Sequence, residues 1–464
     1  MQKSERPNIV FILTDQLRAD ILSAYGGRAC ETPNLDRLAA DSVIYDNAYT
    51  SCAVCTPARA SLQTGRYPSK TGMMTNNLVQ HLQDGPELLS RKLQAQGYSI
   101  GYTGKWHLGD GPSLVGYEAD DFPGHGLGGH IFEQYKQYLA DNGLTHATRN
   151  KLTGHYDEHY AAEEISPIEA TVDYFLVERA IHYIDRFKAR ERPFYFQLNF
   201  WGPHEPYLAP TKHLDRYRDA VIDPWPNFYD NGDKKPSIHQ VKRANDADWS
   251  TFEPLVKHYL AFTSAIDEQI GRLLDYLKRS GLYDDTVILF SSDHGESLGI
   301  HGGLCDKAFF MYEETCKVPL FVKPAQAQAG SAREAGFVGS CDIYATILDL
   351  AGAESRGEQV DGRSFARAAV GLLDWPDCVV TEGSGLENVL FTQRMIRKGD
   401  YKYVFNCGDS DELYDLRLDP HELNNLAGEP AAAETLREMR LSLAAWMSEH
   451  QDKLLHQYKL LRLR

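Results

Sequence analysis

The sequence contains no long hydrophobic run, no dense spacing of cysteines and no block of basic residues. The apolar stretch at residues 9–13 is too short for a membrane span or for the core of a signal peptide. Eight cysteines scattered over 464 residues do not make a disulfide framework. The 48 basic residues face 65 acidic ones, a formal net charge of −17, which disfavours nucleic acid as a partner. We expect a protein that binds neither membrane nor nucleic acid and is cytoplasmic, or periplasmic if the natural chain carries a presequence.

What the sequence does contain is a series of short apolar runs, each followed by polar side chains of the types that serve in catalysis or metal binding. The runs cover residues 8–14, 98–102, 193–200 and 286–290, and helical stretches are expected at 86–96, 170–189 and 251–278. Short buried strands that alternate with helices predict an α/β fold with a large, mostly parallel sheet sandwiched by helices. In such folds the functional groups gather beyond the carboxyl ends of the strands, where these polar side chains fall.

An eleven-residue run that begins at Cys55 reads Cys-Thr-Pro-Ala-Arg-Ala-Ser-Leu-Gln-Thr-Gly. We expect Thr56 to cap a helix that starts at Pro57, so that Cys55 lies just before a helix N-terminus. An anion bound there meets the positive end of the helix, and Arg59 adds a cation whose planar fork suits tetrahedral oxyanions. Cys55 is therefore a candidate nucleophile beside an anion site. The alternatives are a redox pair or half of a zinc site formed with Cys52, or an inert buried cysteine.

The run resembles the signature Cys-x-Pro-x-Arg-x-x-x-x-Thr-Gly of the type I sulfatases, the formylglycine-dependent branch of the alkaline phosphatase superfamily. A second signature of that family appears at residues 101–107, Gly-Tyr-Thr-Gly-Lys-Trp-His. The resemblance implies an alkaline-phosphatase-like fold and oxidation of Cys55 to formylglycine (3-oxoalanine) by a formylglycine-generating or an anaerobic sulfatase-maturating enzyme. It also implies that the hydrate of this aldehyde, not a thiolate, is the nucleophile.

The pattern of the chain changes after about residue 370. Antiparallel strands are predicted at 378–382, 389–397, 400–406 and 412–416, followed by a helix from about 431 to 447. This region is similar to the small C-terminal subdomain of sulfatases, so we divide the chain into a catalytic domain, 1–370, and a C-terminal subdomain, 371–464. The basic tail at 453–464 could dock onto a neighbouring subunit of a homo-oligomer, close over the active site, or be disordered.

Hydrolysis of a sulfate ester requires that its oxygens be neutralised and the nucleophile polarised, and a hard divalent cation held by oxygen ligands does both. Asp15 and Asp293, each after an apolar run, are candidate ligands, although either could instead cap a turn. The resemblance adds Gln16, the modified residue 55 and His294, which could alternatively form hydrogen bonds behind the ligands. Gln and His depart from the commonest pattern, Asp-Asp and Asp-Asn. The loss of one carboxylate and the gain of an imidazole widen the choice of metal; calcium remains the first choice, with manganese, magnesium or zinc as alternatives.

The reaction implied by the resemblance starts when one hydroxyl of the hydrate at position 55 attacks sulfur, which forms a covalent sulfo-enzyme. His204, in the run Trp-Gly-Pro-His, is the expected general acid for the leaving alkoxide, because a histidine can hold a proton near neutral pH. His107 then takes the proton of the second hydroxyl, which expels sulfate and restores the aldehyde.

Further side chains complete the expected site. Lys105 and Lys307 would clamp the sulfate as compact point charges, and Arg59 would hold the hydrate and its turn. Asn76, or its neighbour Asn77, is an additional substrate-binding candidate on the same resemblance. Four histidines in the loop-rich region 110–165 either wall the substrate or, as we favour, are solvated loop residues: His125, His130, His155 and His159.

The leading hypothesis is a sulfatase that acts on a sulfated mono- or oligosaccharide or another small sulfate ester. The alternative is a phosphonate monoester hydrolase or phosphodiesterase of the same superfamily, since sulfate and phosphodiester groups share a shape and differ in oxygen charge. A third hypothesis, an inactive homologue that binds sulfated ligands, predicts decayed catalytic positions. Every position that the mechanism needs carries a suitable residue, which disfavours it.

Overall fold

The computed structural model describes residues 6–76, 80–122, 128–153, 160–243, 247–326, 332–353, 360–366, 375–386 and 389–463. Its centre is an eight-stranded sheet in which every neighbouring pair is parallel except the two pairs made by β10. The strands, in spatial order, are β11 (Ala332–Gly339), β2 (Val43–Tyr49), β10 (Leu320–Lys323), β9 (Thr286–Ser292), β1 (Asn8–Asp15), β7 (Phe194–Pro203), β3 (Ser99–Gly104) and β4 (Glu118–Ala119). The predicted α/β fold with a mostly parallel sheet is thus confirmed.

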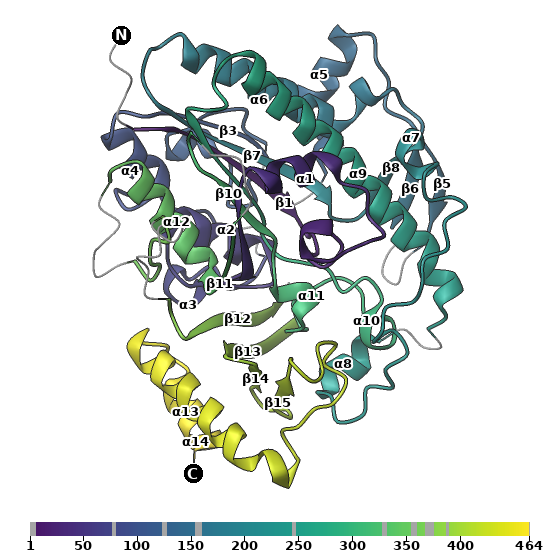
Figure 1. Cartoon of the computed structure of the whole chain (residues 1–464), viewed down its shortest axis with the longest axis vertical. Coiled ribbons are helices and arrows are strands. Elements are labelled where there is room, and N and C mark those ends of the chain that lie inside the picture. The colour runs from purple at the N-terminus through teal and green to yellow at the C-terminus, as the bar shows by residue number, and fades with distance from the viewer. Residues whose placement is uncertain are drawn as a thin grey trace.

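Helices cover both faces of this sheet (Figure 1). Alternate residues of β1 enter two separate cores, because successive side chains of a strand point to opposite faces. Val10 and Ile12 pack with α1 (Pro33–Ala40), α6 (Val172–Lys188) and α9 (Trp249–Arg279). On the other face Ile9, Phe11 and Leu13 pack with α2 (Cys55–Thr64), α4 (Leu89–Ala95) and α12 (Ser340–Leu350).

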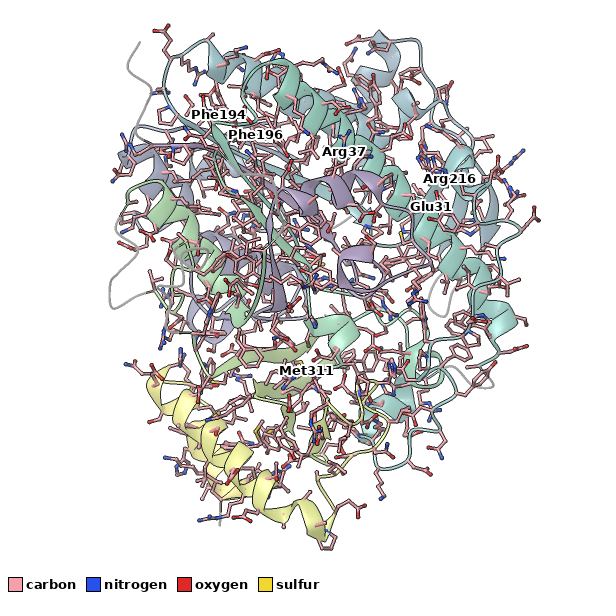
Figure 2. The ribbon with its side chains drawn as sticks, viewed as in Figure 1. Glu31, Arg37, Phe194, Phe196, Arg216 and Met311 are labelled. Atoms are coloured by element: carbon pink, nitrogen blue, oxygen red, sulfur yellow. The ribbon has the colours of Figure 1, made fainter. Side chains whose placement is uncertain are left out.

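The aromatic side chains of β7 show how the first of these cores is filled. Phe194 and Phe196, two residues apart and fully buried, point to the same face of the sheet (Figure 2). Both rings contact Phe187 of α6, with centroid separations of 6.2 and 6.5 Å. This contact holds α6 against the strand that His204 follows.

A second, three-stranded sheet lies beside the carboxyl end of β7. It consists of β5 (Thr148–Leu152), β6 (Ala161–Glu164) and β8 (Tyr207–Pro210), with β6 antiparallel to β5 and parallel to β8. Short helices occupy the surrounding connections: α3 (Pro68–Thr71), α5 (Glu133–Asp141), α7 (Thr211–Leu214), α8 (Ser237–Lys242), α10 (Ile300–Gly303) and α11 (Glu313–Cys316).

The C-terminal region forms the predicted antiparallel sheet, β12 (Cys378–Leu386), β13 (Val389–Lys398), β14 (Tyr401–Asn406) and β15 (Glu412–Asp415), covered by α13 (Ala433–Glu449). The tail forms α14 (Leu455–Arg462), where the Tyr458 hydroxyl donates to the Arg440 carbonyl and Arg462 pairs with Asp411. Closure of the tail over the active site is therefore wrong, because these contacts hold it on its own sheet. The predicted boundary at residue 370 lies outside the described residues, and both it and docking to a second subunit stay predictions.

Among the described residues, no helix is both long enough and apolar enough to cross a membrane.

Candidate active site

The predicted site residues come from different strands of the large sheet and meet at one edge of it. Asp15 ends β1, His294 follows β9 and Lys105 follows β3. These three strands run parallel, so their carboxyl ends lie at the same edge. The N-terminus of α2 brings Cys55 to this edge after β2.

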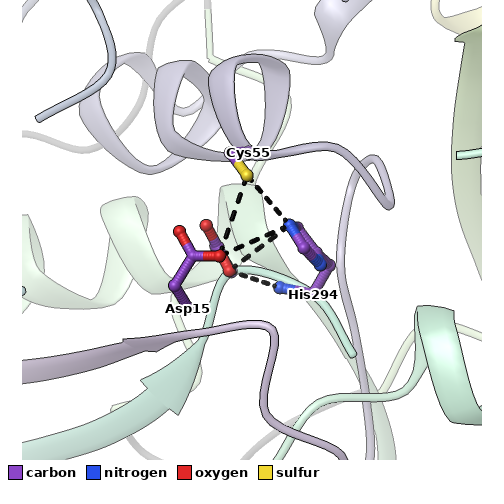
Figure 3. A group of neighbouring side chains, drawn as sticks. Asp15, Cys55 and His294 are labelled. Atoms are coloured by element: carbon purple, nitrogen blue, oxygen red, sulfur yellow. Dashed lines mark hydrogen bonds and ion pairs between the residues drawn. The ribbon is translucent and has the colours of Figure 1, made fainter. Parts of the chain in front are cut away.

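Four buried side chains form the centre: Asp15, Cys55, Asp293 and His294 (Figure 3). One ligand atom from each lies within 4.8 Å of all the others. Cys55 Sγ is 3.2 Å from His294 Nε2 and 3.8 Å from Asp15 Oδ1, and His294 Nε2 is 3.7 Å from Asp293 Oδ1. His294 Nδ1 donates to the Gly295 carbonyl at 2.9 Å, so Nε2 is the nitrogen left to bind a metal. Two carboxylates, an imidazole and an oxygen at position 55 after oxidation fit a divalent cation.

Arg59 and Lys105 balance the charge of this carboxylate pair. The Arg59 guanidinium lies 2.8 Å from Asp15 Oδ2 and donates from Nε to Asp293 Oδ2 at 2.9 Å. Lys105 Nζ lies 2.6 Å from Asp15 Oδ2. Burial alone would raise the pKa of Asp15, but Lys105, His204 and Arg59 hold it below its ordinary value. The pKa of Asp293 is raised by burial and by the charge of Asp15.

Position 55 itself is strongly electropositive. Burial by itself raises the pKa of the Cys55 thiol, yet the cations of Lys105, Lys307 and His294 bring it well below the ordinary value. Lys105 Nζ donates to Sγ at 3.6 Å. His294, beside the thiol and the Asp293 carboxylate, has a pKa raised to about 9 against the opposing effect of burial. An anionic group is therefore stabilised where the thiol stands.

The start of α2 differs from the sequence-based expectation. The helix begins at Cys55, and the Thr56 hydroxyl donates to the carbonyl of His107 at 2.9 Å instead of capping the helix. Asn76 takes the capping role, because its Oδ1 accepts from the Thr56 backbone N–H at 3.0 Å. The predicted Thr56 cap is thus wrong, and Asn76 contacts the helix that carries Cys55. The alternative, Asn77, lies outside the described residues.

Lys307, Gln16 and His204 form a connected group beside the centre. Lys307 Nζ contacts Gln16 Oε1 and donates to His204 Nε2 at 2.9 Å. His204 Nδ1 donates to the Glu205 carbonyl at 2.7 Å. Burial lowers the pKa of His204, but the Glu205 carboxylate reverses this, so the net shift is upward. The Gln16 side chain thus points to Lys307 in this structure, and its role as a metal ligand stays a prediction.

His107 lies behind Cys55 in a dry position. It is 7% exposed, and its Nδ1 has no hydrogen-bond partner among the described residues. Burial lowers the pKa of His107 to about 4, so the ring is neutral near pH 7 and can accept a proton. Its backbone has a φ of 57°, a conformation that the Thr56 hydrogen bond helps to hold.

Sequence reasoning missed a second acidic cluster, Glu205, Glu296 and Asp306, next to this group. Glu296 is fully buried and accepts hydrogen bonds from the backbone N–H groups of Leu298 and Asp306 at 2.9 and 2.7 Å. Lys307 lies 2.8 Å from Asp306 Oδ1, so the cluster surrounds one of the predicted sulfate clamps. The only signal in the sequence was adjacency, since each acid lies within two residues of a predicted site residue.

Comparison with known proteins agrees with this geometry. Residues 7–353 match the family described as Sulfatase, and residues 299–449 match the C-terminal region of N-sulphoglucosamine sulphohydrolase. The chain is 30% identical to a choline-sulfatase of Rhizobium meliloti, over 96% of this chain and 88% of the relative. It is 28% identical to an N-acetylglucosamine-6-O-sulfatase of Bacteroides thetaiotaomicron, over 97% and 88%.

The fold is similar to that of the phosphonate monoester hydrolase of Agrobacterium radiobacter, with a TM-score of 0.80 and 23% identity over 96% of each chain. The family match covers three quarters of the chain and includes the residues that surround Cys55. The chain therefore belongs to the sulfatase family of the alkaline phosphatase superfamily and is a sulfuric ester hydrolase.

Proposed function

We propose that this sulfatase hydrolyses the sulfate ester of a small sulfated sugar at a formylglycine made from Cys55. The observation that carries the proposal is the convergence of cations on position 55, where Lys105 and Lys307 lower the pKa of the thiol while Asp15 and Asp293 stand behind it. Such a site can bind the three charged oxygens of a singly negative sulfate ester and leaves its leaving group facing outward. The similarity to an N-acetylglucosamine-6-O-sulfatase supports a sugar substrate.

The residues around Cys55 fit both groups that the family implies. Formylglycine hydrate would supply the attacking hydroxyl, and a divalent cation, calcium as first choice, would polarise it and neutralise sulfate oxygens. Asp15, Asp293 and His294 would hold the cation, with Gln16 as a further ligand. Arg59 keeps the two carboxylates in register through its two hydrogen bonds.

Proton transfer falls to two histidines with opposite environments. His204 is 18% exposed and has a raised pKa, which favours uptake of a proton at Nε2, the atom that accepts from Lys307 in this structure; once protonated there, it can deliver that proton to the leaving oxygen. His107 is neutral and lies on the dry side of position 55, where it accepts the proton of the second hydroxyl. The upward shift for His204 and the downward shift for His107 support this division into one acid and one base.

The first test compares turnover of an aryl sulfate, an aryl phosphonate monoester and sulfated mono- and disaccharides. The enzyme is coexpressed with a formylglycine-generating enzyme, and Cys55→Ala is the control. A sulfated sugar turned over best, with an inactive control, supports the proposal. If the phosphonate ester is turned over best, the protein is instead a phosphonate monoester hydrolase, the function named for the neighbour of similar fold.

A second test addresses the general acid. His204→Asn should lower kcat/KM for an alkyl sulfate by about 10²- to 10⁴-fold, because a poor leaving group needs the proton. The same change should cost much less for a nitrophenyl sulfate, whose leaving group departs as the anion. Equal losses for both substrates would assign His204 to binding only.

A further inference from the structure

A cavity opens beside His204, and Cys55 is not among the residues that line it. It has about 510 Å³ of space free of protein atoms, a volume that includes the open solvent in front of it. His204 and Glu205 form one edge of it. Because His204 is the proposed proton donor to the leaving oxygen, the rest of the leaving group lies in or next to this cavity.

One wall of the cavity carries carboxyl groups. Glu164 ends β6, and Asp173 lies in the first turn of α6; the two are 4% and 6% exposed. His146 Nε2 lies 3.2 Å from Glu164 Oε1, and the His146 ring stacks on that of His130 at a centroid separation of 5.9 Å. His130, which we expected to be a solvated loop residue, is thus part of this wall.

The charge of this wall is unlike that of the catalytic centre. Among the described residues that line the cavity there is no lysine and no arginine. Burial and the neighbouring Glu164 raise the pKa of Asp173 to about 8, so the carboxyl is largely protonated at neutral pH and needs no cation. A second sulfate or a carboxylate placed here would meet Glu164, Asp173 and Glu205 without a compensating positive charge.

The opposite wall is aromatic and apolar. Trp201 and Phe262 line it, and Trp201 is held by edge contacts with Phe122 and a tilted contact with Phe132 at centroid separations of 5.5 and 5.7 Å. The Trp201 indole Nε1–H is buried and has no hydrogen-bond partner among the described residues, although a buried indole N–H usually has one. An aromatic wall facing a wall of neutral hydrogen-bonding groups suits a ring with apolar C–H faces and several hydroxyls.

We infer that this cavity is the leaving-group subsite and that its carboxyl wall selects an uncharged sugar ring with a single sulfate against sugars that carry a second anionic group. The inference rests on the proposed function and names its substrate class. The sulfate lies between Lys105 and Lys307, and the sugar ring extends past His204 into the cavity, where its hydroxyls reach Glu164 and Asp173.

The test measures kcat/KM of the matured enzyme for neutral hexoses sulfated at each single position and for the same sugars with a second sulfate. Nitrophenyl sulfate is the reference, because it reports the catalytic centre whatever the sugar selectivity. We expect the best monosulfated sugar to exceed its disulfated counterpart by about tenfold or more. A disulfated sugar, or an alkyl sulfate with a quaternary ammonium group, turned over better than every neutral sugar would overturn the inference.

At pH 9, above the pKa of Asp173, the double variant Glu164→Gln, Asp173→Asn should bring the neutral-to-disulfated ratio to within about threefold of unity, since it removes the carboxylate charges of the wall. Circular dichroism checks that the double variant is folded. Glu163→Gln is the matched control, because Glu163 is the preceding residue of β6 and pairs with Arg149 and Arg218 instead of lining the cavity. An unchanged ratio in the double variant refutes the role of the carboxyl wall.

A wrong function and a wrong subsite give different experimental results. If nitrophenyl sulfate is not hydrolysed and the phosphonate ester is, the proposed function is wrong. If nitrophenyl sulfate is hydrolysed but the sugars show no preference for a single charge, only the subsite assignment is wrong. Should the double variant not fold, the substrate panel on the wild-type enzyme still decides.

Discussion

Replacement of Lys402 by methionine should loosen the small C-terminal sheet from the rest of the molecule. Lys402 lies on β14, and its Nζ is 2.6 Å from Glu422 Oε1 and 3.2 Å from Glu313 Oε1 on α11. The side chains of Lys402 and Glu422 are at most 1% exposed. Removal of one partner of a buried ion pair leaves an uncompensated charge and costs about 3–5 kcal/mol of unfolding free energy.

The cost should depend on pH in a definite direction. Burial raises the pKa of Glu422 to about 8 even with Lys402 present. Without the lysine this pKa rises further, so the folded variant holds its proton to higher pH than the unfolded chain does. A carboxyl whose pKa is raised on folding lowers the unfolding free energy as pH increases, up to its folded value. The deficit of the variant relative to the wild type should therefore be larger at pH 9 than at pH 6.

The assay is urea unfolding at both pH values, followed by tryptophan fluorescence, which includes Trp446 of α13. Lys402→Met combined with Glu422→Gln should recover part of the loss, because it removes both charges. Lys398→Met is the matched control, since that lysine forms an exposed pair with Asp377 and should cost less than about 1 kcal/mol. If Lys402→Met lowers the unfolding free energy no more than this control at either pH, the contacts of Lys402 with Glu422 and Glu313 do not attach the C-terminal sheet to the rest of the protein.

Three further changes test the site. Arg59→Lys keeps a charge but loses the fork that spans Asp15 and Asp293, and kcat/KM for nitrophenyl sulfate should fall about 10²-fold or more; a loss below fivefold contradicts this. Calcium at about a thousand times its Kd should raise the unfolding free energy of the wild type by about 4 kcal/mol. Thermal melts with and without a chelator measure this increment, and Asp293→Asn should abolish it. A wild type whose melting temperature does not change with chelator contradicts the prediction. Relative to the wild type, the Asp173→Asn variant should be more stable at pH 9 than at pH 5, because burial and the neighbouring Glu164 raise the pKa of Asp173 to about 8 in the folded protein. The gain in unfolding free energy is at most about 1.4 kcal/mol for each unit by which this pKa exceeds that of the unfolded chain. If urea unfolding gives the variant and the wild type the same dependence of unfolding free energy on pH, the prediction is contradicted.

Much of the fold follows from local patterns in the chain. The expected strands at 8–14, 193–200 and 286–290 are β1, β7 and β9, and the expected helix at 251–278 is α9. Each is a short, uninterrupted apolar run or a strongly periodic helix, so its own residues determine its structure. The same applies to the C-terminal strands and to α13. The motif around Cys55 and the acids that follow β1 and β9 were also visible, because the carboxyl ends of parallel strands gather chemistry at one edge.

Other elements depend on partners far away in the sequence. β11 is largely exposed and lacks an apolar alternation, and it becomes a strand by pairing with β2, where Ala332 lies opposite Val43. β5 is equally polar and pairs with β6. The cap of α2 was assigned to Thr56 because that residue directly precedes Pro57, the expected first residue of the helix. Asn76 supplies the cap instead, from twenty residues downstream of Thr56.

The division between sequence and tertiary structure is sharpest at the active site. The residue types and their order along the chain by themselves determined the family, the candidate nucleophile and the acids at the strand ends. Only the tertiary structure decided that Lys307 contacts Gln16 and His204, and that Glu164, Asp173 and Trp201 share a cavity beside that histidine. The reason is physical: a motif encodes chemistry within a few residues, whereas the charge and shape of a pocket arise from side chains that the sheets and helices bring together from distant parts of the chain.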